Sequence, residues 1–165
     1  MSRTLSNVLI GFVLIALAGC GFHLRGSAVL PEALKLMYVQ GINIDDRGLG
    51  RELKQGLTRN GVTVVERYQE GSAVLTILEN KVERRVLSVG SDAKVSEYGL
   101  HGWVSFKVSD GSGQVISEAQ KVEAQRDYQF DQENVLGKGE EERLLREQLN
   151  QQLVQSILRR LSALK

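Results

Sequence analysis

The sequence predicts an α+β fold of two layers, in which two helices pack on one face of a mostly antiparallel or mixed four-stranded sheet. Two observations lead to this class. A long stretch from Val95 to Phe130 alternates between apolar and polar residues, as strands do when one face of a sheet is buried. The end of the chain instead repeats leucines at helical spacing, which is typical of an amphipathic helix that covers a sheet.

The first nineteen residues have the pattern of a signal peptide that is removed. Arg3 supplies positive charge, residues 8–18 form a short apolar run, and small residues precede Cys20. A spanning helix needs roughly 20 apolar residues, so this run is too short to remain in a membrane. The pattern resembles the lipobox of bacterial lipoproteins, which implies acylation of the Cys20 thiol. Two or three acyl chains on one residue would give stable anchoring. The alternative, an ordinary secretory peptide followed by a chance cysteine, explains fewer of these positions.

The predicted organisation is a lipoprotein signal peptide over residues 1–19, an acylated tether over 20–33, and a single α/β domain over 34–165. Removing the signal leaves 146 residues, the size of one domain with a substantial core. That mature chain carries 20 basic and 20 acidic residues, so its formal net charge is zero. We therefore expect no bulk attraction to nucleic acid or to an anionic membrane surface, although local charged patches remain possible.

Cysteine and histidine usage argues against a metal site. Cys20 is the only cysteine, and acylation consumes it. The two histidines, His23 and His101, are far apart in the sequence and belong to no ligand-spaced cluster. We expect no metal and no cofactor.

The first half of the chain predicts a strand, a helix, a short strand and a longer strand, in that order. Leu49, Leu53 and Leu57 form an i, i+4, i+8 stripe, preceded by Asp45-Asp46 at the positive end of the helix dipole and followed by the left-handed stop Asn60-Gly61. The expected strands cover 34–39, 62–65 and 73 to about 87. The later half of the third strand alternates poorly, which indicates a bulge or an exposed edge.

The second half predicts a long hairpin and a long helix. The buried face of the hairpin is expected to hold Tyr98, Leu100, Val104, Phe106, Val108, Ile116, Val122, Ala124, Tyr128 and Phe130. The other face should expose Glu97, His101, Ser105, Lys107, Ser117, Lys121, Glu123, Gln125 and Asp127. A turn at residues 110–113 joins the two strands. The helix runs from about Glu140 to Leu164, with a stripe of Leu144, Leu145, Leu149, Leu153, Ile157, Leu158, Leu161 and Leu164. Such a helix is about 37 Å long, enough to cross a whole sheet.

The motifs that suggest catalysis are weak. Gly137-Lys138-Gly139 lacks the first glycine and the Ser or Thr of a phosphate-binding loop. Ser105, His101 and Asp127 can be assembled on paper into a nucleophile, a base and an orienting group, but no nucleophile elbow surrounds any serine. Polar residues on a sheet face explain them better, and dipole complementarity explains the acidic runs 45–46 and 140–142 at expected helix starts.

Basic residues gather at two positions. Arg84, Arg85 and Lys94 flank the loop 88–92, while Arg126 and Lys138 bracket the exit from the hairpin into the last helix. Cations at one rim could clamp phosphates, since Arg offers a bidentate fork and Lys a compact charge. On spacing alone, a solvated rim balanced by neighbouring acids is favoured.

Several segments together resemble the LPS-assembly lipoprotein LptE family, also known as RlpB. The matching segments are residues 20–26, Pro31, Glu97-Tyr98, Arg126-Asp127-Tyr128 and Phe130. The resemblance implies a non-enzymatic, two-layer α/β lipoprotein of the outer membrane, with Gly21 fitting outer-membrane sorting. It also implies that the domain sits as a plug in the lumen or on the periplasmic side of the LptD β-barrel translocon, and helps to deliver lipopolysaccharide to the outer leaflet.

The resemblance also implies where lipopolysaccharide is bound. In the family, a basic loop before Glu97-Tyr98 is thought to contact lipid phosphates. Lys94 is the nearest basic residue to that position, whereas Ser91 and Asp92 are not basic, and Lys138 is the second candidate. Arg84, Arg85 and Arg126 complete the candidate set. Two other functions remain open: an envelope scaffold lipoprotein that binds only protein, and, least favoured, an anchored hydrolase.

Overall fold

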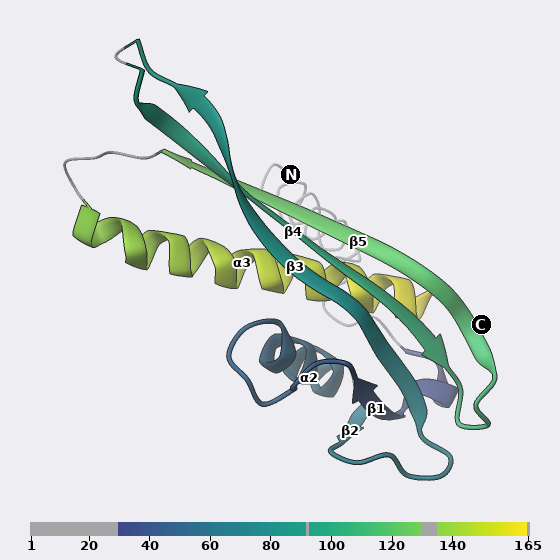
Figure 1. The fold of residues 1–165 in the computed structure, drawn as a ribbon. Coiled ribbons are helices and arrows are strands. Elements are labelled where there is room, and N and C mark those ends of the chain that lie inside the picture. Colours follow the sequence, from purple (N-terminus) through teal and green to yellow (C-terminus); the bar gives the residue numbers. More distant parts are fainter. Residues whose placement is uncertain (1–29, 92, 130–134, 165) are drawn as a thin grey trace, which may run out of the picture.

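The computed structural model describes residues 30–91, 93–129 and 135–164, and these residues form one sheet with two helices on one of its faces (Figure 1). The α+β class and the two-helix layer are therefore confirmed. The elements in chain order are the 3-10 helix η1 (Glu32–Leu34), β1 (Leu36–Gln40), α2 (Leu49–Arg59), β2 (Thr63–Val65), β3 (Ala73–Val89), β4 (Val95–Ser109), β5 (Val115–Gln129) and α3 (Val135–Ser162).

The sheet has five strands in the order β2-β1-β3-β4-β5, so the prediction of four strands was wrong. The shortest strand is β2, which was itself expected over residues 62–65 and joins the sheet by pairing in parallel with β1, from Leu36 and Thr63 to Tyr38 and Val65. So short a segment joins a sheet through its backbone partners rather than through its own pattern. Since β1 also pairs in parallel with β3 and the remaining pairs are antiparallel, the sheet is mixed, as expected.

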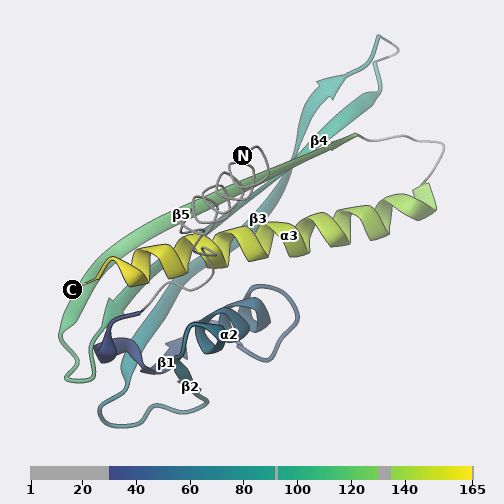
Figure 2. The same ribbon diagram turned by 180° about the vertical axis from the view of Figure 1, so that it is seen from behind.

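The distal parts of β3 and β4 form an arm that extends beyond the rest of the sheet. β1 pairs with β3 only as far as Thr76, so from Ile77 onward β3 has β4 as its one strand partner among the described residues. This confirms the exposed edge that the poor alternation of residues 81–85 predicted, whereas the irregularities of the β3–β4 ladder lie outside that stretch, after Ile77 and near Ser88. β5 ends opposite Glu97, so the hairpin tip projects past it (Figures 1 and 2).

A bulge in β5 corrects one predicted face. Phe106 pairs with Gln120 but Val108 pairs with Ser117, so β5 contains one residue more than β4 over this stretch. The extra residue reverses the alternation before it. Ser117, expected to face water, is consequently buried, while Ile116, expected to be buried, is only partly buried. Beyond the bulge, Val122, Ala124 and Tyr128 are buried as predicted, and Phe130 lies outside the described residues.

The core lies between the sheet and the two helices. Leu49, Leu53 and Leu57 of α2 are buried, and Gly61 follows the helix with a positive φ, which confirms the predicted stripe and stop. On α3 the fully buried side chains are Leu149, Leu153, Ile157 and Leu161. Leu144 is half exposed instead of buried, because α2 does not extend beneath the first turns of α3 (Figure 1).

Two predicted helix starts were displaced. α2 begins at Leu49 after Gly48, so Asp45 precedes the first turn and pairs with Lys54 at 2.8 Å. α3 begins at Val135 and has no acidic residue in its first turn, so residues 140–142 do not serve the helix dipole at its start. Within the described ranges, neither helix has the length and apolar character that a membrane crossing requires.

Candidate functional site at the arm end of the sheet

Two separate sequence motifs meet at the base of the arm. Glu97-Tyr98 of β4 and Arg126-Asp127-Tyr128 of β5 lie on neighbouring strands, and Tyr98 pairs directly with Tyr128. The two tyrosine rings lie 5.8 Å apart between centroids, a separation typical of interacting aromatic pairs. The long antiparallel register therefore brings Tyr98, Arg126 and Tyr128 to one place on the face that the helices cover.

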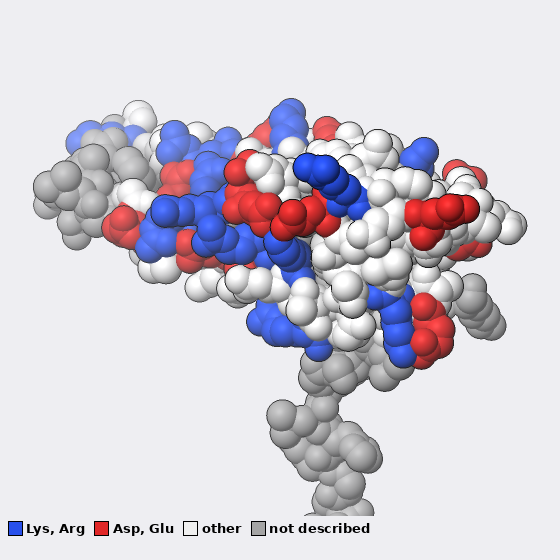
Figure 3. All heavy atoms as spheres, turned by 90° about the horizontal axis from the view of Figure 1, so that it is seen from below, with Lys and Arg blue, Asp and Glu red and all other residues white. Residues whose placement is uncertain are grey.

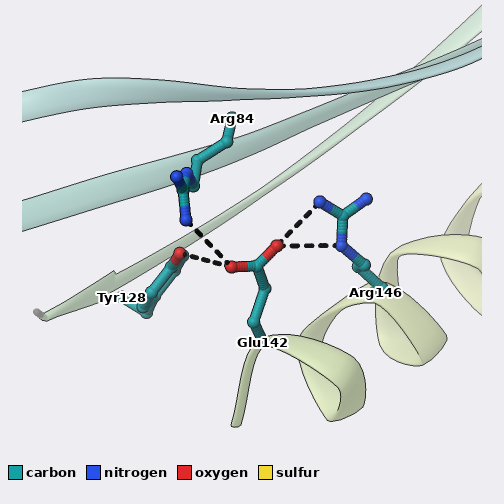
Figure 4. A network of polar contacts seen from close by, with 4 residues as sticks. All are labelled: Arg84, Tyr128, Glu142 and Arg146. Atoms are coloured by element: carbon teal, nitrogen blue, oxygen red, sulfur yellow. Dashed lines mark hydrogen bonds and ion pairs between the residues drawn. The ribbon is translucent and has the colours of Figure 1, made fainter. Parts of the chain in front are cut away.

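Glu142 of α3 joins this aromatic pair to two arginines (Figure 4). Its Oε2 accepts a hydrogen bond from the Tyr128 hydroxyl at 3.0 Å and lies 3.3 Å from Arg84 Nη1. Its Oε1 accepts two hydrogen bonds from Arg146, from Nε at 3.0 Å and Nη2 at 2.7 Å. One carboxylate thus connects β3, β5 and α3. Dipole complementarity, the explanation that the sequence suggested for Glu142, does not include this role.

The protonation states of the network favour a structural role. Burial by itself would raise the pKa of Glu142, but the hydrogen bonds from Arg146 and Tyr128 outweigh it, and the pKa lies below its ordinary value. Burial raises the pKa of Tyr128, and the bond to Glu142 adds to that effect. Glu142 is therefore charged and Tyr128 neutral at physiological pH, which suits a clamp rather than acid–base catalysis.

The predicted basic residues are divided among three places. Arg84 lies with its guanidinium carbon 4.6 Å from the centre of the Tyr98 ring, and its side chain is about half exposed. Arg126 shares that face, because both residues pair with Leu100, and its Nη1 donates to the Gln125 carbonyl at 2.9 Å. Arg85 projects from the opposite face and pairs with Glu83 at 3.0 Å. The five candidates therefore do not form one clamp.

Lys94 and Lys138 belong to the same end of the molecule. Lys94 is exposed at the arm tip, where the Gly90 amide donates to its carbonyl oxygen at 2.7 Å and Ala93 adopts a positive φ of 61°. Lys138 lies within the first turns of α3, not in the segment before it, and its side chain is outside the described residues. The arm and the start of α3 lie at one end of the long axis (Figure 1).

The arm exposes apolar side chains close to these cations. Val86, Leu87 and Val89 are 52%, 45% and 55% exposed, although they are large hydrophobic residues at the end of a strand. Leu144 on α3 is 50% exposed. On the face shown in Figure 3, basic and acidic residues also crowd the half at the arm end, whereas the other half is largely covered by uncharged residues. The arm end thus combines charge with exposed apolar surface.

The hypothetical catalytic group is not assembled. Along the ladder, Ser105 lies opposite Lys121, His101 opposite Gln125, and Asp127 opposite Gly99. His101 Nε2 instead contacts Glu123 at 3.3 Å. In the part of the chain that the structure describes, no cluster of three or more His, Cys, Asp or Glu side chains has a geometry suited to a metal ion. Cys20 lies outside the described residues.

Comparisons with known proteins agree on one family. Residues 34–161 match the family model LptE, described as lipopolysaccharide-assembly. The LPS-assembly lipoprotein LptE of Photorhabdus laumondii is 28% identical, with 98% of this chain and 87% of that protein covered. A minor lipoprotein of Acinetobacter baumannii has a similar solved structure with 30% identity, a TM-score of 0.66, and 81% and 94% of the two chains covered. The solved structure of lipoprotein B of Nitrosomonas europaea is also similar, with 27% identity and a TM-score of 0.68. The match covers 87% of this chain and 91% of that one.

Proposed function

This chain belongs to the LptE lipopolysaccharide-assembly family, and from that premise we propose that it is an outer-membrane lipoprotein anchored through Cys20 that plugs and assists an LptD-type β-barrel translocon. In this proposal the single domain sits in the lumen or on the periplasmic side of the barrel, and the arm end binds lipopolysaccharide during its delivery to the outer leaflet. No step requires a metal, a cofactor or covalent catalysis.

The arm end carries the lipopolysaccharide part of the proposal. Lipopolysaccharide presents clustered phosphates beside acyl chains, so a protein that handles it needs cations next to apolar surface. Lys94 lies at a tip whose neighbours Val86, Leu87 and Val89 are exposed. Charge-assisted hydrogen bonds from lysine to phosphate are stronger than neutral ones, while the apolar side chains suit acyl chains. The Glu142 network, formed by Arg84, Tyr128, Glu142 and Arg146, holds the base of this arm against α3.

The helix-free face of the sheet supports the plug part of the proposal. It carries rows of ion pairs, with Lys81 and Arg85 on Glu83 and Lys121 on Glu123. Trp103 lies between two of these lysines, whose Nζ atoms are 5.3 and 5.0 Å from its ring centre. A face that is charged and well paired suits contact with the polar interior of a transmembrane barrel.

Affinity isolation of the full-length lipoprotein from outer membranes tests the partner. A co-purifying large β-barrel is expected, and its absence would contradict the plug. A binding titration with lipopolysaccharide and with ordinary phospholipid then separates the proposal from its alternative. An LPS-assembly plug should prefer lipopolysaccharide, whereas an envelope scaffold that binds only protein should show no preference.

A further inference from the structure

A basic groove lies at the end of the molecule opposite the arm. It is an open hollow of about 410 Å³ between β5 and the last turns of α3, and its lining includes Lys121, Glu123, Ser156, Arg159 and Arg160. Three of these residues are cationic and one is anionic, so the lining carries an excess of positive charge. Lys121 and Glu123 also belong to the helix-free face assigned to the plug, but Arg159 and Arg160 take part in neither the predicted phosphate contacts nor the plug.

Among the described residues, the partners of the two arginines of this groove are neutral. Arg159 Nη2 donates to Ser156 Oγ at 2.8 Å, and Arg160 Nη1 donates to Gln120 Oε1 at 3.1 Å. No carboxylate of the described residues forms an ion pair with either arginine. By contrast, Arg143 and Arg146 near the start of the same helix each pair with glutamates. Cations in the last turn of a helix interact favourably with the helix dipole. That interaction explains neither the groove nor the lack of carboxylate partners around these arginines.

The position of this groove indicates its ligand. The described chain begins at Leu30 beside η1, and this segment lies at the same end of the long axis as the end of α3 (Figures 1 and 2). Ten residues separate Cys20 from Leu30 and span at most about 36 Å when extended. α3 has 28 residues and is about 42 Å long, so the arm lies much farther along the molecule. An acylated Cys20 therefore keeps the groove end within about 36 Å of the membrane surface, whereas the arm can lie farther away.

We propose that the groove of Arg159, Arg160 and Lys121 binds the phosphate of anionic phospholipid headgroups in the leaflet that holds the lipid anchor. The inference rests on the proposed anchoring at Cys20. Guanidinium groups bind phosphate oxygens in a bidentate manner, and those of Arg159 and Arg160 have no carboxylate of the described residues to displace. The contact orients the domain with its arm away from the anchored leaflet.

The test measures partition of the non-acylated mature chain, residues 20–165 with Cys20→Ala, onto lipid vesicles. The described core begins at Leu30, so this chain retains all of it. Its formal net charge is zero, so a preference for anionic vesicles requires a local patch. We expect stronger partition onto phosphatidylcholine vesicles that contain phosphatidylglycerol than onto phosphatidylcholine alone. A cation near an anionic surface contributes about a fivefold factor, so Arg159→Gln with Arg160→Gln should weaken that partition about 25-fold.

The matched control replaces two cations at the arm end, Arg85→Gln with Arg143→Gln. Both are paired with glutamates, and the variant loses the same formal charge, so its partition should remain close to that of the parent. Equal partition of the Arg159/Arg160 variant and the parent would overturn the proposal, as would an equal loss in the control. Selective loss of binding to lipopolysaccharide-containing vesicles, with phosphatidylglycerol binding kept, would also overturn it. Failure of the proposed function is seen separately, as missing acylation or a missing barrel partner.

Discussion

Gly102 of β4 lies directly against Leu149 of α3: a Cβ atom on the glycine would come within 2.7 Å of Leu149 Cδ2 and 3.2 Å of Leu153 Cδ1. Both leucines are fully buried. The absence of a side chain at Gly102 therefore lets the long helix approach the middle of the sheet. This close approach fixes the height of α3 above the strands whose distal parts form the arm.

Replacing Gly102 with valine should therefore destabilise the domain. Valine favours strands, but here its side chain would overlap Leu149, and overpacking of this kind costs about 1–3 kcal/mol. Urea unfolding followed by circular dichroism measures the change. Gly139→Ala in α3 is the control, because nothing lies within 4 Å of its Cβ position, and alanine should raise the unfolding free energy by about 0.5–1 kcal/mol.

Leu149→Asp or Leu153→Asp should cost several kcal/mol, close to the whole stability of a typical domain. Each substitution would bury a carboxylate without a partner at a position that is 0% exposed. The readout is the thermal unfolding midpoint. Leu144→Asp, at a half-exposed position on the same helix, should leave that midpoint nearly unchanged. Similar midpoints for all three variants would show that this stripe does not face the core.

The Glu142 network predicts a dependence of stability on acid pH. The pKa of Glu142 in the folded protein lies below the ordinary value of 4.5, so its contribution is complete above about pH 4.5 and is lost as the pH falls through the folded pKa. Glu142→Gln should lower the unfolding free energy at neutral pH by about 1–2 kcal/mol. It should also flatten the decline of stability below pH 4.5.

Chemical denaturation at several pH values tests this prediction. Glu118→Gln changes an exposed carboxylate of β5 and should preserve both the neutral stability and the acid dependence. If the Glu142 variant declined in acid as steeply as the parent, the ion pairs with Arg84 and Arg146 would contribute little.

The sequence predicted the buried faces of elements whose apolar residues follow one regular period. Its predictions were wrong where strand pairing or a bulge determines the structure. The leucine stripe of α2 and the alternation of β4 predicted their buried faces correctly. Ser117 was assigned to the wrong face because a bulge changes the alternation without leaving a sign in residue type. The strand at 62–65 was expected, but the sheet was predicted with one strand too few, because only the pairing with β1 shows that so short a strand belongs to it.

The candidate site was predictable only in part. The pairing of Tyr98 with Tyr128 follows from a hairpin register that the alternation almost determines. Glu142 is distant from Arg84 and Tyr128 in sequence, so only the placement of α3 reveals their contact. An arginine four residues after Glu142 was the available signal, because i, i+4 pairs are neighbours on a helix, but the acidic run 140–142 was assigned to the helix dipole instead.

The lipid anchor predicts the outcome of one substitution. Cys20→Ala should abolish acylation and block maturation of the full-length protein, because the Cys20 thiol is the one acyl acceptor that the chain offers. Labelling of cells with radioactive palmitate, followed by isolation of the protein, measures this directly. Label that persists on the variant would contradict the lipoprotein assignment of Cys20.

The functional prediction concerns Lys94 and Lys138. Each is a basic residue in a segment that the LptE resemblance links to phosphate contact, and the arm tip and the start of α3 lie at the same end of the molecule (Figure 1). Charge-assisted bonds to phosphate contribute about 1.5–3 kcal/mol each. Since about 1.4 kcal/mol corresponds to a factor of ten, Lys94→Asp with Lys138→Asp should weaken lipopolysaccharide binding at least tenfold.

The fold and the barrel association of this double variant should persist, because neither lysine belongs to the described core. Circular dichroism and co-purification check that part, and a lipopolysaccharide titration at moderate salt checks the other, since salt screens weaker surface charges. Arg159→Asp with Arg160→Asp is the matched control, as it makes the same change of formal charge at the far end of α3. If the lysine variant bound lipopolysaccharide as tightly as the parent, these lysines would be solvated rim residues. The protein-binding scaffold would then explain the arm better.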